Sequence, residues 1–336
     1  MEHPEHGSRR RLVGAAAAAS AVPALGLNNH ASAAENWRMY IFLPSPTMNT
    51  SQGLSKMAER LQAESKGELS LRFHVGGSLQ IPVTNMTSAV ADGVVQFGDD
   101  GFYHGSFPWG GAIRLPMLVQ TEQEFAQAQQ IIRPYLEAAY LKKGVLLLSQ
   151  YSYPAQVGFS RRKLVSLEDY KGQKLRVSSA EQGEFVRTFG GVPVTLGTPE
   201  VPSSLDRGVI DGVFTSAAPG GWSWRESLKF NYRLVIGFFD SNLIVNKAAF
   251  EKLSPAMQQR MRSTVTETAP TLSAVMKRDD DATIDQLKSV MTVTMAGVDE
   301  VKKATAAMAP YWDNWARSKG PDAIEIVGKL RAVFKR

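Results

Sequence analysis

Hydrophobic and polar positions alternate along the first part of the chain in patterns typical of strands and helices. The spacing predicts strands at 37–43, 69–75 and 94–97 and helices at 52–65 and 83–91. A β-α-β-α-β order is typical of an α/β domain with a mainly parallel sheet, in which ligands bind beyond the carboxyl ends of strands. The loops after Leu43 and Phe97 are therefore early candidates for a binding site.

A second set of elements follows a strongly helical stretch at 122–143. Strands are predicted at 145–150, 151–159, 174–177 and 192–196, and helices at 181–189 and 199–207. The segment 209–213 leads into another strand. The segment 151–159 contains Pro154 and is predicted as a crossing strand. The chain then returns to a strand at 238–245.

The segment from Ser254-Pro255 to about Val290 has a single interruption, Pro270. A continuous helix of this length would be about 50 Å long, which exceeds a typical globular helix. We therefore expect it to cross from one domain to another. A short strand at 292–296 and helices at 298–315 and 321–334 complete the chain.

The short strand 174–177 carries the first candidate for chemistry. Leu175 and Val177 alternate with Lys174 and Arg176, so that one face can be buried while the other presents cations. Arg176 stands at the end of the strand beside a helix start, and its planar fork of donors suits a carboxylate. The alternative is a surface arginine on an edge strand.

Composition narrows the function classes. The 336 residues carry a net charge of +6, and the basic residues are scattered, so we expect no nucleic-acid partner. The chain has no cysteine, which excludes disulfides, thiolate metal sites and a cysteine nucleophile.

Residues 1–33 have the pattern of an export signal. Arg9-Arg10-Arg11 precedes an Ala-rich apolar run at 14–27, and Ala31-Ser32-Ala33 is typical of a cleavage site. The paired arginines fit a twin-arginine signal, with a plain secretory signal as the alternative. Either signal predicts a periplasmic protein whose mature chain starts near Ala34.

Catalytic motifs are absent from the sequence. Only His74 and His104 remain after the signal, and no GxSxG, HExxH, P-loop or GxGxxG is present. The run Asp279-Asp280-Asp281 reads as a solvated helix face, because consecutive helical residues point in different directions. Asp99 and Asp100 lie at a predicted strand end, where metal or substrate contact and a capping role are both open. The sequence favours binding over catalysis, with no cofactor and no metal.

Several motifs resemble one known family. Leu-Glu-Asp-Tyr-Lys-Gly-Gln-Lys-Leu-Arg-Val at 167–177 is similar to the signature of DctP-type solute-binding proteins of tripartite ATP-independent periplasmic (TRAP) transporters. Further matches follow in the order of the family: Gly76-Gly77-Ser78-Leu79, Ala89 to Val94, Leu115-Pro116-Met117-Leu118, Gly208-Val209-Ile210-Asp211-Gly212 and Leu253-Ser254-Pro255.

The resemblance implies an α/β, two-lobed periplasmic binding protein fold (type II-like) with crossing strands and a long lobe-spanning helix. We expect lobe I to comprise 34–153 plus 242–281 and lobe II to comprise 154–241 plus 282–336. The lobes would close on an organic acid, and the loaded protein would deliver it to TRAP membrane permease subunits. The family's ligand-binding arginine corresponds to Arg176.

The chain also departs from the family's pattern. Gln156 stands where a second arginine is common, and Thr215 stands where an asparagine contacts the ligand. Asp99, Thr198 and Asn242 fall at family pocket positions. Aromatic residues in or near candidate loops favour a monocarboxylate with an apolar or aromatic body, although core packing is the alternative role for each: Phe102, Tyr103, Phe214, Trp222 and Trp224.

Three other functions remain open at this stage. An ABC-type substrate-binding protein would have the same lobed shape with another membrane partner. A periplasmic enzyme acting on a carboxylic acid would use Asp99 as base, although we expect no enzyme. A binding protein that reports to a sensor receptor is the third alternative.

Overall fold

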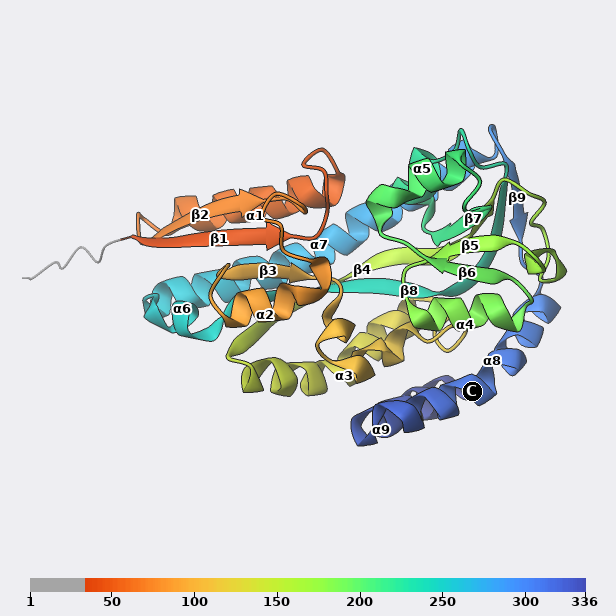
Figure 1. The fold of residues 1–336 in the computed structure, drawn as a ribbon. Coiled ribbons are helices and arrows are strands. Elements are labelled where there is room, and N and C mark those ends of the chain that lie inside the picture. Colours follow the sequence, from red (N-terminus) through yellow and green to blue (C-terminus); the bar gives the residue numbers. More distant parts are fainter. Residues whose placement is uncertain (1–33) are drawn as a thin grey trace, which may run out of the picture. The chain divides into compact units, whose positions relative to one another are not determined.

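The computed structural model describes residues 34–336, which form one compact unit. The predicted export signal and its cleavage site lie outside the described residues. A single mixed sheet with the order β2-β1-β3-β8-β4-β7-β5-β6 runs through this unit, and β9 pairs with β8 (Figure 1). Its strands are β1 (Glu35–Ile41), β2 (Leu69–His74), β3 (Phe97–Asp100), β4 (Val145–Ser160), β5 (Lys174–Val177), β6 (Val192–Thr195), β7 (Gly212–Thr215), β8 (Phe230–Asn246) and β9 (Thr292–Met295).

Helices cover the sheet and join its two ends. They are α1 (Asn49–Glu64), α2 (Met86–Ala91), α3 (Glu122–Lys142), α4 (Ala180–Thr188), α5 (Val201–Asp206), α6 (Lys247–Lys252), α7 (Pro255–Leu287), α8 (Val298–Lys319) and α9 (Pro321–Phe334). The last helix, α9, returns to pack against α3 and the short 3₁₀ helix 108–114.

The strand pairings place the carboxyl ends of two parallel sets opposite each other. In the first set β1 is parallel to β2 and β3, and in the second β5 is parallel to β6 and β7. Strands β3 and β7 run in opposite directions, because each is tied to the antiparallel pair β8 and β4. The strand β3 ends opposite Asn242, which pairs with Gln150, whereas β7 ends opposite Val157. The two ends therefore face each other across a stretch of β4 that spans roughly 20 Å.

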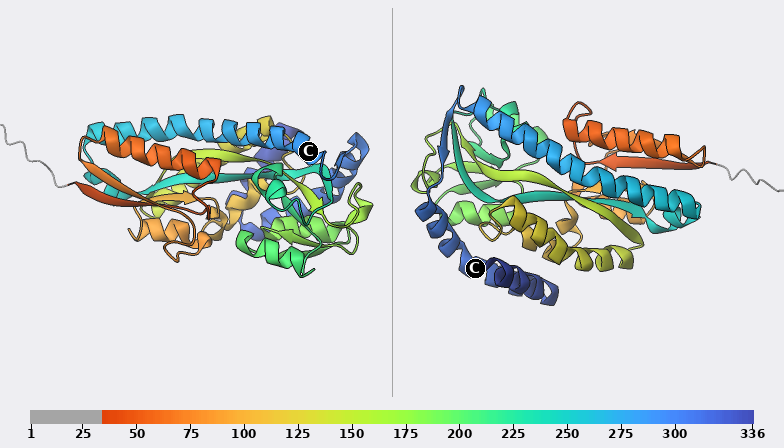
Figure 2. Two further views of the ribbon diagram at one scale, coloured as in Figure 1. Left: turned by 90° about the horizontal axis from the view of Figure 1, so that it is seen from above. Right: turned by 180° about the vertical axis from the view of Figure 1, so that it is seen from behind.

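The long helix α7 connects both halves of the sheet along one side (Figure 2). It has 33 residues with Pro270 inside, which confirms the predicted long helix. Its apolar residues pack under α1, β1 and β8, and they recur at helical spacing: Met257, Met261, Val265, Ala269, Leu272 and Met276. Near the middle of the helix, the hydroxyl of Ser273 accepts a hydrogen bond from the backbone N–H of Ser152 in β4 at 2.9 Å.

The structure corrects several element boundaries. Strand β3 begins three residues later than predicted, because residues 94–96 form a bend. The two strands predicted at 145–150 and 151–159 are one strand, β4, which bends at irregular pairings instead of breaking. Strand β8 begins at Phe230, eight residues before the predicted start at Phe238.

The expectation of a solvated face at Asp279-Asp280-Asp281 is wrong for Asp280. Its side chain is only 5% exposed and lies 3.7 Å from the guanidinium of Arg233 on β8. It also accepts the backbone N–H of Ala218 at 2.9 Å. Asp280 therefore ties α7 to the turn at 217–221, whereas its neighbour Asp281 is exposed and pairs with Lys277.

Candidate functional site

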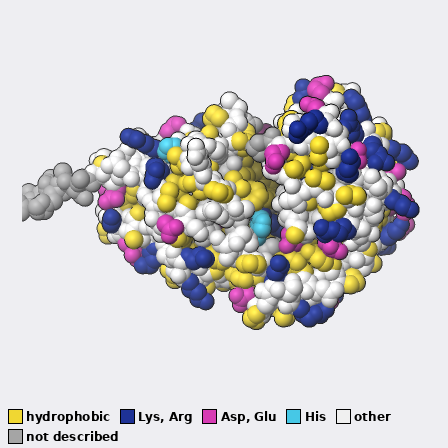
Figure 3. All heavy atoms as spheres, viewed as in Figure 1, with side chains coloured by type: hydrophobic (Ala, Val, Ile, Leu, Met, Phe, Trp, Pro, Cys, Tyr) yellow, Lys and Arg dark blue, Asp and Glu magenta, His cyan; other side chains and the backbone are white. Residues whose placement is uncertain are grey.

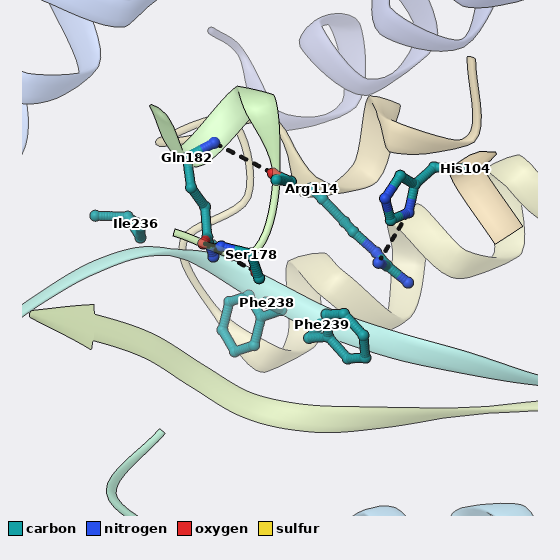
Figure 4. Close-up of a pocket in the computed structure, with 9 residues that line it drawn as sticks. His104, Arg114, Ser178, Gln182, Ile236, Phe238 and Phe239 are labelled. Carbon is teal, nitrogen blue, oxygen red and sulfur yellow. Dashed lines mark hydrogen bonds between the residues drawn. The ribbon is translucent and has the colours of Figure 1, made fainter. Parts of the chain in front are cut away.

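The face of the molecule is hollowed between the two sets of strand ends (Figure 3). The middle of β4 and β8 lies between them. A pocket at this place has His104 and Arg114 from one half of the sheet and Ser178, Ser179 and Gln182 from the other (Figure 4). The remaining lining residues are Ile236 to Phe239 of β8. The hollow is therefore bounded by side chains from both halves.

Arg176 is a buried arginine whose guanidinium has no carboxylate within 4.0 Å among residues 34–336. It is 7% exposed. Its Nε–H donates to the backbone carbonyl of Leu196 at 2.9 Å, which fixes the side chain. Burial lowers the pKa of Arg176 to about 10, with Glu200 opposing that shift. The alternative of a surface arginine is therefore wrong for Arg176, whereas Lys174 on the same face of β5 is exposed.

Thr215 lies close to Arg176 in the sheet. Arg176 pairs with Val213 of β7, and Thr215 follows two residues later on the same face. The turn 217–221 folds back onto it, since a Cβ added to Gly220 would stand 2.1 Å from Thr215 Oγ1. Trp222 follows this turn, half-buried, with the guanidinium of Arg225 4.3 Å from its ring centre.

Other predicted site residues occupy varied places. Gln156 lies half-buried on β4, where its amide donates to the carbonyl of Pro154 at 3.1 Å. Thr198 is exposed in the short helix 198–200. Phe214 is fully buried against Tyr170 and Phe185, so it forms core and no part of the hollow surface.

Asp99 and Asn242 are also fully buried. Asp99 accepts hydrogen bonds from the hydroxyls of Tyr151 (3.0 Å) and Ser241. Burial raises the pKa of Asp99 to about 7, against the lowering effect of these donors. Asn242 donates to the hydroxyl of Tyr140 at 3.1 Å, which in turn donates to Asp100 at 3.0 Å. The two carboxyl groups are the last two residues of β3, at the strand end that the sequence predicted, but both are buried.

Tyr103 is buried beside an ion pair that the sequence gave no reason to expect. Arg114 donates to Asp240 through Nε–H at 2.8 Å and approaches the same carboxylate through Nη2 at 2.7 Å. The hydroxyl of Tyr103 donates to the same carboxylate at 3.1 Å. The ring of Tyr103 therefore packs against this pair, with its centre 4.8 Å from the Arg114 guanidinium.

Four half-buried rings pack together as an aromatic platform: Phe42, Phe102, Tyr153 and Phe239. One of them, Phe239, lines the pocket. In five of the six pairs the ring centres lie 5.3 to 6.1 Å apart, at contact distance. Phe42 and Phe102 follow the carboxyl ends of β1 and β3, whereas Tyr153 and Phe239 come from the middle of β4 and β8. The sequence indicated Phe102 alone. Phe42 could not be singled out, because the predicted strand at 37–43 includes it, whereas β1 ends at Ile41 and leaves Phe42 beyond the strand end.

His104 and Gln182 are further pocket residues that were not predicted. Nδ1 of His104 lies 3.4 Å from Nη1 of Arg114 (Figure 4). Burial, followed by the charge of Arg114, lowers the pKa of His104 to about 4. Gln182 is 9% exposed, and its Oε1 accepts from the backbone N–H of Ser178 at 2.9 Å.

This arrangement defines a solute-binding protein of the two-lobed periplasmic type, in which crossing strands link two α/β halves around a hollow. The chain belongs to the bacterial extracellular solute-binding proteins of family 7 (DctP), whose model matches residues 43–319. The predicted relationship to the solute receptors of TRAP transporters and the predicted fold class are thus confirmed. Proteins of this family are extracytoplasmic, and no helix within residues 34–336 combines the length and apolar character that a membrane crossing needs.

Curated relatives bind different solutes. The ectoine-binding periplasmic protein TeaA of Halomonas elongata is 22% identical over 73% of this chain and 75% of its own length. The 2,3-diketo-L-gulonate-binding periplasmic protein YiaO of Escherichia coli is 24% identical over 82% of this chain and 86% of its own.

Solved structures share the fold. DctP7 of Bordetella pertussis, a receptor binding pyroglutamic acid, has a TM-score of 0.81 and 24% identity, covering 89% of this chain and all of its own. A TRAP solute-binding protein of Desulfovibrio salexigens with bound orotic acid has a TM-score of 0.79 and 19% identity, covering 88% of this chain and 97% of its own.

Proposed function

We propose that this protein is the periplasmic receptor of a TRAP transporter for an organic acid, and that Arg176 binds the carboxylate of that acid. The observation that carries this proposal is the buried guanidinium of Arg176, which lacks a carboxylate partner among the described residues. Removing an unpaired charge from water is costly, so such a group is stabilised when an anion arrives. A bidentate arginine–carboxylate pair also fixes the orientation of the ligand.

Two other largely buried arginines provide the contrast. Arg114 pairs with Asp240, and Arg233 lies 3.7 Å from Asp280. Both are therefore neutralised within the chain. Of these three arginines, Arg176 alone has no carboxylate partner among the described residues, and the ligand would supply one.

The aromatic platform supports an acid with an apolar or flat body. Half-buried rings offer area that a planar or apolar group can cover, and such burial contributes roughly 25 cal/mol for each Å² removed from water. With Arg114 already neutralised, the same surroundings favour a monocarboxylate over a dicarboxylate. Among relatives, the receptors that bind pyroglutamic acid and orotic acid are consistent with this class.

Binding would shift the protein toward a closed form in which both halves contact the ligand. The bends in β4 and β8 between the two sets of strand ends are where such a hinge would lie. The closed form would be the one that the membrane permease subunits recognise. An enzymatic role for Asp99 is disfavoured, because its carboxyl is fully buried and already accepts from Tyr151 and Ser241.

The test is a thermal-shift screen of residues 34–336 against monocarboxylates, dicarboxylates, oxo acids and aromatic acids, followed by calorimetry. A ligand that binds only the folded state raises Tm by mass action. We expect Arg176→Ala to weaken binding at least 100-fold and Arg176→Lys about tenfold, because the ammonium cannot bind bidentately. Arg207→Ala, which removes an exposed arginine from the same half, should bind like the unchanged protein. Unchanged affinity in Arg176→Ala would overturn the proposal.

A further inference from the structure

The pocket beside the hinge contains two hydrogen-bond donors without partners among the described residues. The first is the carboxamide nitrogen of Gln182. Its Oε1 accepts from both the backbone N–H and the hydroxyl of Ser178, at 2.9 and 3.0 Å. A backbone N–H can only donate, so the oxygen must be the atom on that side. The NH₂ group is thereby directed into the pocket by a side chain that is only 9% exposed.

The second donor is Nε2–H of His104. The guanidinium of Arg114 can only donate, so Nδ1 of His104 must accept its hydrogen bond at 3.4 Å. The burial of His104 next to Arg114 keeps the ring neutral near pH 7. A neutral ring that accepts at Nδ1 carries its proton on Nε2. Arg114, which Asp240 holds in place, thus fixes the tautomer of His104 that carries its proton on Nε2.

The size and charge of the pocket restrict what these donors can bind. Its free volume is about 10 Å³, close to what one water-sized group occupies. The positive charge of Arg114 is already matched by Asp240, so no uncompensated cation remains in this pocket for a second carboxylate. Gln182 Oε1 and His104 Nδ1 already accept hydrogen bonds, so these two side chains offer a bound group only donors. A carbonyl oxygen accepts from two donors and has no hydrogen of its own.

We propose that His104 and Gln182 bind a carbonyl oxygen of the ligand, so that the receptor selects oxo acids from other monocarboxylates. This inference rests on the proposed function, because the carboxylate of the same acid binds Arg176. Ser178 lies two residues after Arg176, roughly 7 Å along the chain, so one small molecule can reach both sites. His104 and Gln182 come from different halves of the sheet, and the carbonyl oxygen joins them.

Paired acids that differ only by the carbonyl test this proposal by calorimetry. The pairs are 4-oxopentanoate with pentanoate and 3-oxocyclopentanecarboxylate with cyclopentanecarboxylate. We expect the unchanged protein to bind the oxo member of each pair at least tenfold more tightly, because the site's buried donors stay unpaired with the other member.

Two variants then remove one donor each. Gln182→Glu keeps the oxygen that accepts from Ser178 and replaces the NH₂ group with oxygen. His104→Phe keeps a ring beside Phe102 and Tyr103 without the donor. Each should reduce the preference for the oxo member, measured as the ratio of the two affinities in the same variant, about tenfold. The Tm of each unliganded variant shows whether that variant folds normally. If one variant is defective, the ligand preference of the other variant tests the proposal.

The outcomes separate this inference from the proposed function. If both variants keep the full preference for oxo acids, or if the unchanged protein has no such preference, the inference is overturned while the role of Arg176 stands. Loss of binding for both members of a pair in Arg176→Ala supports the carboxylate site independently. If the unchanged protein binds none of these acids, the inference fails outright.

Discussion

The guanidinium of Arg114 and the carboxylate of Asp240 approach to 2.7 Å, with side chains that are 7% and 0% exposed. Arg114 comes from the 3₁₀ helix 108–114, whereas Asp240 lies on β8. The same guanidinium stands 4.1 Å from the ring centre of Phe239. One ion pair therefore fixes the 3₁₀ helix, a ring of the aromatic platform and the orientation of His104.

Breaking this pair should destabilise the protein strongly. We expect Asp240→Asn to lower the free energy of unfolding by about 3 to 5 kcal/mol, because it leaves the charge of Arg114 buried without a counter-charge. The double variant Arg114→Met with Asp240→Asn should recover part of that loss. Urea unfolding of the single and double variants measures both effects, and a loss under 1 kcal/mol in Asp240→Asn would contradict the argument. Lys277→Ala with Asp281→Ala, an exposed pair, serves as the control.

Asp99 should make the free energy of unfolding fall as the pH rises toward 8. Burial raises the pKa of Asp99 to about 7, so the native state holds this proton more tightly than the unfolded chain does. Its stabilising contribution is fully present below about pH 4 and is lost as pH rises through 7. Relative to Asp99→Asn, the unchanged protein should lose about 2 to 4 kcal/mol of stability between pH 4 and pH 8.

Chemical denaturation at several pH values measures this difference. Asp285→Asn is the control, because its carboxylate side chain is 78% exposed. The stability of this variant should change with pH as that of the unchanged protein does. If the stability of Asp99→Asn also changes with pH as that of the unchanged protein does, the pKa of the buried carboxyl is not raised and the prediction is wrong.

Gly220 should tolerate no side chain. A Cβ at this position would meet Thr215 Oγ1 at 2.1 Å, well inside the contact distance, so the turn 217–221 or the strand β7 must move. We expect Gly220→Ala to destabilise the protein by about 1 to 3 kcal/mol and to weaken ligand binding. Gly297→Ala is the matched control, since nothing lies within 4 Å of the added Cβ. Thermal unfolding compares the two, and equal Tm values would refute the prediction.

Asp280 should matter far more than its neighbours in the acidic run. Removing its charge leaves Arg233 without its nearby carboxylate and weakens the bond to Ala218. We expect Asp280→Asn to cost about 1 to 3 kcal/mol and Asp281→Asn less than about 0.5 kcal/mol. Equilibrium unfolding of the two variants checks this order, and the reverse order would exclude the anchoring role of Asp280.

Local patterns in the sequence predicted much of the fold. The strand at 174–177 has its predicted bounds because its alternation is flanked by a turn and a helix cap, both of which are local signals. The long helix α7 could likewise be predicted, because Pro270 is the only interruption of its helical pattern. The crossing strands were predicted less well, because β4 bends through irregular pairings that only its partner strands support.

Fewer residues of the candidate site could be predicted from the sequence. Arg176 could be singled out, since its strand and the family's motif coincide. The partners of Arg114 could not, because Asp240 stands 126 positions away and no local pattern joins them. The position of Asp99 and Asp100 at a strand end could be predicted, but their burial could not. Both carboxyl groups are buried because hydroxyls from β4, β8 and α3 supply the hydrogen bonds that burial requires.

The order of strands in the sheet has a consequence for biosynthesis. Strand β3 pairs with residues 242–245 of β8, about 140 residues after Asp100. At 5 to 20 residues per second, a ribosome needs roughly 10 s to make that stretch. Throughout this time one edge of β3 has no strand beside it, so the first α/β half of the nascent chain cannot complete its sheet. Nearly three-quarters of the chain must therefore be made before β3 can pair on both sides, and unpaired strand edges of this kind favour aggregation.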